Sequence, residues 1–167
     1  QNLTLSVTKF PATQYADQLK YLVRYPHGCL EQTTSKLFPQ LYFEELAAAV
    51  APNMYVNGNP VYYIKEGIRK LQGLQRSDGS FSYWPAGSYS WWSSVYATHF
   101  LVEAQKKGYE IDANLLRRAL RFLERTASGK ELYDYRSYRS GGSITIQSRV
   151  RKELPYSLYV LALAGQP

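Results

Sequence analysis

Apolar side chains recur at spacings of three and four residues over six segments of the chain, a pattern typical of amphipathic helices. We expect helices over residues 13–24, 33–50, 61–75 and 91–107, a fifth that follows Asp112 and a sixth that begins near Leu154. No segment has the sustained alternation of a long strand. The predicted fold class is therefore all-α, with helices stacked as α-hairpins in a single domain over residues 1–167.

Residues that start or stop helices agree with several of these boundaries. Asp112 is a good N-cap, Gly108 is well placed to end the fourth helix, and Pro155 suits a first helical turn. Pro39 lies within the second segment, so that helix either kinks there or starts near it. We expect the boundaries elsewhere to be less sharp.

Three segments lie outside the helical pattern. Residues 1–12 are expected to form an extended lead-in, and residues 77–90 a turn-rich loop with several aromatic side chains. Residues 128–152 are predicted to be a polar loop region, with one short alternating patch at 144–146. These loops would connect the helices without adding a second domain.

Composition excludes some function classes. The chain has 167 residues, a net charge of +7, 45% hydrophobic residues and 16 tyrosines. Its basic residues are spread along helical faces, and only 149–152 forms a dense run, so we expect no nucleic-acid partner. No apolar run approaches about 18 residues, so we expect no membrane insertion by this segment.

The one cysteine, Cys29, precedes Gln32 by three residues at the edge of a predicted helix. Side chains at that spacing can meet on one face. A helix N-terminus favours the thiolate, which could attack the Gln32 carboxamide, expel ammonia and leave a thioester. The same spacing also fits an inert packed cysteine, which is the commoner use of a lone Cys. Spacing alone leaves both interpretations open.

The longer string around these two residues resembles a known family. Tyr-Pro-His-Gly-Cys-Leu-Glu-Gln-Thr-Thr-Ser-Lys-Leu-Phe-Pro, residues 25–39, is similar to the thioester segment of the bacterial branch of the α2-macroglobulin and complement family. Residues 74–81, 95–100 and 158–164 also resemble that family's helical domain. The resemblance covers nearly the whole chain, and its first motif is the most specific.

This resemblance implies a thioester between Cys29 and Gln32 within part of an α/α toroid. The family's ring contains more helices than are predicted here, so we expect a truncated domain that self-associates as a dimer, swaps elements or is partly disordered. The implied function is broad protease inhibition: the Gln32 acyl group passes to a lysine amine of an attacking protease, once per molecule, without enzymatic turnover. Other domains of a parent macroglobulin would be partners, the location would be the bacterial periplasm or cell envelope, and no cofactor or metal is implied.

Three neighbours are candidates for supporting roles. Tyr25 could shield the thioester. His27 could act as a local base or acid, or could simply fill an aromatic position. Glu31 could orient Gln32, or could stabilise the helix start by its charge. The aromatic loop at 81–92 could likewise cover the site or only pack at the toroid rim.

The chain departs from complement-type members of the family. Those members carry a histidine downstream of the cysteine that redirects the acyl group to hydroxyls, and the matching stretch, 133–147, contains none. We therefore expect direct reaction with amines. His99 is interpreted as a core or rim residue.

Two other classes compete with the covalent trap. One is a non-reactive helical scaffold of the same family. The other is a terpene-cyclase-like α/α barrel, which needs an acidic cluster, and Glu44-Glu45 lacks companions. A thiol protease is disfavoured because no histidine and acid accompany Cys29 in a suitable context.

Overall fold

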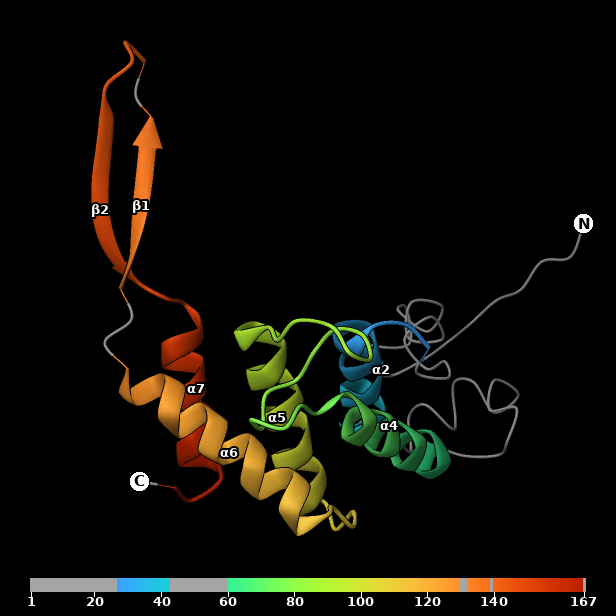
Figure 1. Ribbon diagram of the computed structural model, residues 1–167. Helices are drawn as coiled ribbons and strands as arrows, with labels where there is room; N and C mark the ends of the chain where they lie inside the picture. Colours follow the sequence, from blue (N-terminus) through green and yellow to red (C-terminus); the bar gives the residue numbers. More distant parts are fainter. Residues whose placement is uncertain (1–26, 43–59, 130–131, 139, 167) are drawn as a thin grey trace, which may run out of the picture.

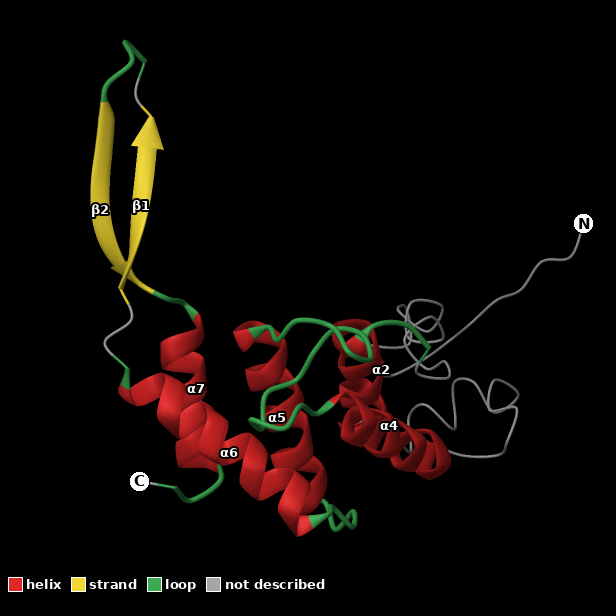
Figure 2. Cartoon of the chain, in the orientation of Figure 1, coloured by secondary structure: helices red, strands yellow, loops and turns green. Residues whose placement is uncertain are grey.

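The computed structural model describes residues 27–42, 60–129, 132–138 and 140–166. Over these residues the chain is mostly helical, with a two-stranded sheet, so the all-α prediction is confirmed (Figures 1 and 2). The elements are α2 (Leu30–Tyr42), α4 (Pro60–Leu74), α5 (Trp91–Lys106), α6 (Ala113–Ser128), β1 (Leu132–Tyr138), β2 (Ile144–Val150) and α7 (Glu153–Leu163). The lead-in at 1–12, the helix predicted at 13–24 and residues 43–50 of the second predicted helix lie outside the described residues.

Helix α5 is the centre of the helical body. It contacts α2 on one side and α6 and α7 on the other (Figure 1). Small side chains such as Ala97, Thr98 and Ala104 are fully buried on it, beside the larger Phe100 and Leu101. Because neighbouring helices cover it from several sides, α5 is apolar around much of its circumference.

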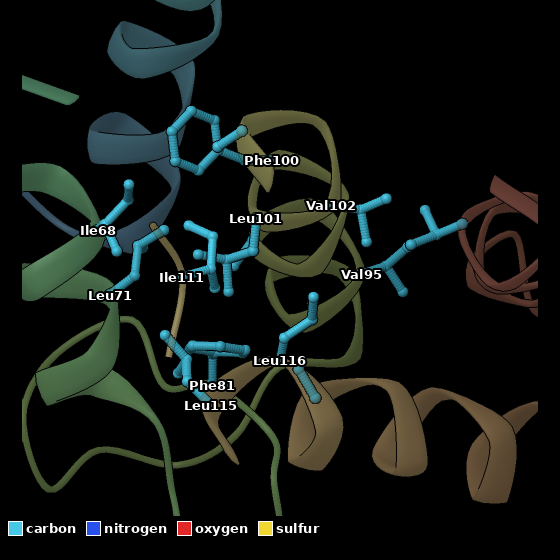
Figure 3. Packing of buried hydrophobic residues seen from close by; sticks show 14 of the residues in the cluster. Ile68, Leu71, Phe81, Val95, Phe100, Leu101, Val102, Ile111, Leu115 and Leu116 are labelled. Atoms are coloured by element: carbon cyan, nitrogen blue, oxygen red, sulfur yellow. The ribbon is translucent and has the colours of Figure 1, made fainter. Parts of the chain in front are cut away.

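One hydrophobic core joins all the described helices. Figure 3 shows Ile68 and Leu71 of α4 facing Leu101 of α5, with Leu115 of α6 close to Phe81. Phe81 comes from the loop between α4 and α5 and is fully buried. The loop therefore contributes an anchor to the core and is held against the helices at that point.

The helix signals at three boundaries are confirmed. Asp112 caps α6, its Oδ1 accepting hydrogen bonds from the backbone N–H groups of Asn114 and Leu115 at 2.8 and 2.9 Å. Gly108 follows α5 with a φ of +87°, a conformation that favours glycine. Pro155 lies in the first turn of α7.

Helix α2 begins three residues earlier than the pattern predicts. The prediction placed its start at Thr33, whereas the helix runs from Leu30 and contains Pro39. Two backbone hydrogen bonds define this start: Leu30 N–H donates to Tyr83 O at 3.0 Å, and Thr33 N–H donates to Cys29 O at 2.9 Å. The first of these comes from the distant aromatic loop, so it is a tertiary contact.

The prediction of a loop over residues 128–152 is wrong for most of that region. Strands β1 and β2 pair antiparallel, from Leu132 opposite Val150 to Tyr138 opposite Ile144, and extend away from the helices (Figure 1). Most side chains of both strands are exposed, so neither face needs the apolar alternation that marks a half-buried strand. The sequence signal was weak for that reason.

None of the helices in the described part of the chain combines the length and the apolar character that crossing a membrane requires.

Candidate functional site

Cys29 and Gln32 meet at the first turn of α2. Cys29 directly precedes the helix, and its backbone N–H donates a hydrogen bond to Gln32 Oε1 at 3.1 Å. A glutamine three residues after the N-cap that reaches back to the N-cap N–H is one half of a capping box. The hydrogen bond therefore folds the carboxamide of Gln32 back toward the residue that carries the thiol.

Gly28 makes room for this arrangement. Its φ is +115°, and a Cβ built on it would lie 2.2 Å from Gln32 Oε1. Any other residue would both strain the backbone and displace the carboxamide. The glycine in the sequence motif is thus required by the close approach of Gln32.

Two lysines hold the backbone that leads into the helix. Lys36 Nζ, from α2 itself, donates to His27 O at 2.9 Å. Lys70 Nζ, from α4, donates to Gly28 O at 2.7 Å. Together with the bond from Leu30 N–H to the aromatic loop, these contacts fix the peptide units on both sides of Cys29.

Lys70 is the polar residue that sequence reasoning missed. The pKa of Lys70 is held below its ordinary value, first by burial and then by the neighbouring Lys36 ammonium, while a negative charge on Cys29 acts against the shift. Lys70 lies 42 residues from Gly28 and looks in sequence like any polar-face lysine of an amphipathic helix. No local signal could have selected it.

The supporting candidates fare differently. Tyr25 lies outside the described residues. His27 is exposed, and its backbone carbonyl is what Lys36 contacts. Glu31 is exposed in the first turn of α2, where a negative charge stabilises a helix start. The structure thus supports a helix-stabilising position for Glu31 and leaves a direct role for either side chain as a prediction.

The aromatic loop divides into two parts. Phe81 is fully buried in the core, which fits the interpretation that the loop packs against the helices. Tyr83 and Trp84 instead line a pocket of about 520 Å³ whose wall also contains Gly28 and Lys70. Part of the loop therefore lies beside the candidate site.

His99 belongs to a separate aromatic cluster between α2, α5 and α7. Its Nδ1 and the Tyr156 hydroxyl are joined by a hydrogen bond of 2.8 Å, and the Phe38 ring lies 5.0 Å from the imidazole. Burial is the main cause that lowers the pKa of His99. The interpretation of His99 as a core or rim residue fits these contacts.

Comparison with known proteins finds relatives of this chain. The sequence pattern of the A-macroglobulin TED domain matches residues 4–164. The α2-macroglobulin of Escherichia coli strain K12 is 34% identical over 123 residues, which cover 68% of this chain and 7% of that protein. The α2-macroglobulin of Xylella fastidiosa strain Temecula1 is 30% identical over 138 residues, covering 79% of this chain and 8% of the relative.

Solved structures of such proteins also superpose on the chain. Native E. coli α2-macroglobulin matches with a TM-score of 0.67 at 27% identity, over 90% of this chain and 9% of that one. Salmonella α2-macroglobulin reacted with methylamine matches with a TM-score of 0.65 at 28% identity, over 92% of this chain and 10% of that one. The chain spans a tenth or less of the length of these proteins.

Proposed function

Because this chain belongs to the A-macroglobulin TED domain family, we propose that Cys29 and Gln32 form an internal thioester that traps proteases covalently. The observation that carries the proposal is the hydrogen bond of 3.1 Å from Cys29 N–H to Gln32 Oε1. It orients the carboxamide at the helix N-terminus beside the cysteine. Within the family, the parent protein acts as a protease inhibitor and not as a catalyst.

Formation of the bond needs no added reagent. Cys29 Sγ attacks the Gln32 side-chain carbonyl carbon, the C–N bond to the amide nitrogen breaks, and ammonia leaves with the thiol proton. The carbonyl oxygen becomes negatively charged as Sγ attacks, and the first-turn N–H groups of α2 present partial positive charge in that region. The N–H of Cys29 already donates a hydrogen bond to Oε1, so it can stabilise this charge directly.

In the capture of a protease, Cys29 Sγ is the leaving group, whereas it is the nucleophile when the thioester forms. The amine nitrogen of a protease lysine attacks the same carbon, the C–S bond breaks with its electron pair on Cys29 Sγ, and the surplus amine proton passes to water. A thiolate is a far better leaving group than an alkoxide. The product is an amide, which is stable, so each molecule reacts once.

Two solved structures of relatives fit a reaction with amines and a response to proteases. One solved structure is of Salmonella α2-macroglobulin reacted with methylamine, and another is of E. coli α2-macroglobulin activated by trypsin. The chain has two histidines, and His99 is engaged with Tyr156 in a different part of the fold. We therefore propose direct transfer to amines, in the bacterial periplasm or cell envelope, with the other domains of the parent protein controlling access.

Intact mass before and after methylamine tests the proposal. A thioester makes the polypeptide about 17 Da lighter than its sequence mass, and methylamine then adds about 31 Da and releases one thiol. Cys29→Ser and Gln32→Ala should both have the full sequence mass and no methylamine product. Gly28→Ala should strongly reduce the fraction of molecules that show the mass deficit, because its Cβ would clash with Gln32 Oε1.

The opposite result separates the alternatives. A wild-type polypeptide with the full sequence mass, a free thiol and no methylamine product would favour the non-reactive scaffold. A polypeptide about 1 Da heavier than its sequence mass, with the change located at Gln32, would instead indicate a thioester that formed and hydrolysed. Equal glycerol and methylamine should give mainly the methylamide, and a mainly glycerol ester product would overturn direct amine transfer.

A further inference from the structure

Lys70 reaches the candidate site from a different helix. It lies on α4, which packs against α2, and its Nζ donates to the carbonyl of Gly28, the residue before Cys29, at 2.7 Å. The lysine is partly buried and forms part of the wall of the pocket with Gly28, Tyr83 and Trp84. Apolar groups around it reduce solvent screening, so its charge acts more strongly than that of a surface lysine.

A second ammonium lies nearby. Lys36 binds the carbonyl of His27, so two positive groups sit on consecutive carbonyls just before Cys29. Burial, and after it the repulsion from Lys36, lowers the pKa of Lys70, whereas a negative charge on Cys29 acts in the opposite direction. Two cations at one chain segment repel each other, and a negative charge that forms on the adjacent Cys29 would offset that repulsion.

We infer that Lys70 is a positioning residue for acyl transfer: it holds the Gly28 carbonyl and stabilises the negative charge that collects on Cys29 Sγ when the bond to Gln32 breaks. This inference rests on the proposed thioester. The bond that forms joins the amine nitrogen to the Gln32 carbonyl carbon, and the bond that breaks is C–S. The electron pair stays on Sγ, the amine proton passes to water, and Lys70 keeps its own proton throughout.

The first test compares methylamine reaction rates of four variants. Lys70→Met removes the charge and keeps the apolar stem, Lys70→Gln keeps a hydrogen-bond donor without the charge, and Lys70→Arg keeps both charge and donor. Lys65→Met is the matched control, because Lys65 is an exposed lysine on the same helix. The rate of thiol release, assigned to Cys29 by peptide mass mapping, should fall about three- to tenfold in the two neutral variants. Lys70→Arg should stay within about twofold of wild type, and Lys65→Met should be unchanged.

A second readout separates charge from structural support. Once methylamine has freed Cys29, its alkylation is measured with anionic iodoacetate and with neutral iodoacetamide. A nearby ammonium attracts the anionic reagent. The rate with iodoacetate divided by the rate with iodoacetamide should therefore fall about threefold in Lys70→Met and Lys70→Gln. A variant that only loosened the fold would alter both rates together and leave the ratio unchanged.

The outcomes distinguish the two ideas. If wild type shows neither the mass deficit nor the methylamine product, the proposed thioester fails, and with it the role of Lys70 in transfer. If wild type reacts but Lys70→Met and Lys70→Gln match Lys65→Met in both readouts, only the Lys70 inference is overturned. A loss in Lys70→Arg equal to that in Lys70→Met would also overturn it. Should Lys70→Met fail to fold, as judged by thermal melting, Lys70→Gln supports the same comparison.

Discussion

The helical body and the β1–β2 hairpin are stabilised in different ways. In the body, side chains such as Phe81, Phe100 and Leu123 are fully buried in one shared core. In the hairpin, Tyr138 is 73% exposed, and the contacts are cross-strand pairs and ring stacking, for example Arg149 Cζ 3.9 Å from the Tyr135 ring centre. Burial stabilises the body, whereas backbone pairing and exposed contacts hold the hairpin.

This difference explains where the candidate site lies. Cys29 is held by α2, by Lys70 of α4 and by the loop that Phe81 anchors in the core. Packed elements position reacting groups more accurately than exposed segments do. The hairpin presents a second kind of surface, because its pairing register places a set of exposed apolar side chains on one face: Leu132, Tyr138, Ile144, Ile146 and Val150.

The largest change in the free energy of unfolding is expected from truncating a core side chain of the body. Phe81→Ala should lower the free energy of unfolding by about 3–5 kcal/mol, because it empties a fully buried site in the core. The same truncation at the exposed Tyr138 of the hairpin should change it by less than about 0.5 kcal/mol. Urea unfolding followed by far-UV circular dichroism measures both. Equal losses would show that the hairpin shares the stability of the body.

Two glycines of α4 provide a matched pair within the body. A Cβ on Gly67 would lie 2.4 Å from the Leu37 methyl carbons, so Gly67→Ala should destabilise by about 1–3 kcal/mol through overpacking between α4 and α2. A Cβ on Gly73 would meet no atom within 4 Å beyond its chain neighbours and the adjacent helix backbone, so Gly73→Ala should stabilise by up to about 1 kcal/mol. Thermal melts of the two variants should move in opposite directions. A gain from Gly67→Ala would mean that the α2–α4 packing is loose.

The His99 cluster should make the stability of the body depend on pH. Burial lowers the folded-state pKa of His99 below 6.5, with Lys106 acting in the same direction and Glu103 against it. The unfolded chain therefore takes up a proton first as pH falls, so the stability from neutral His99 is present above about pH 6.5 and is lost below it.

The variants His99→Gln and His27→Gln test this dependence. Urea midpoints measured between pH 5 and 7.5 should rise with pH in wild type and more weakly in His99→Gln. His27→Gln, at the exposed histidine outside the cluster, is the matched control variant. An unchanged slope in His99→Gln would assign the pH dependence to other groups.

A small and local effect is expected from the cation–π contact in the hairpin. Arg149→Gln removes a cation–π contact with Tyr135 that is worth about 0.5–1 kcal/mol at an exposed site. Amide hydrogen exchange should rise in β1 and β2 and stay unchanged in α4 and α5. Faster exchange throughout the helices would show that the two regions unfold together.

Local sequence pattern was sufficient for much of the body and for the close approach of the Gln32 side chain to the backbone of Cys29. Helices α4, α5 and α6 follow from apolar periodicity, and Asp112 and Gly108 mark boundaries by their own backbone chemistry. Cys29 and Gln32 are three residues apart, so one helical turn brings them together. Such features depend on neighbours within a few residues.

The features that were missed depend on contacts between distant segments. The start of α2 at Leu30 involves a carbonyl of Tyr83, and the Gly28 carbonyl is bound by Lys70 of another helix. The strands of the hairpin are defined by pairing with each other, and exposure on both faces removes the apolar alternation that would reveal them. A local pattern records burial on one face of one element, whereas these contacts exist only once the helices and loops have packed together.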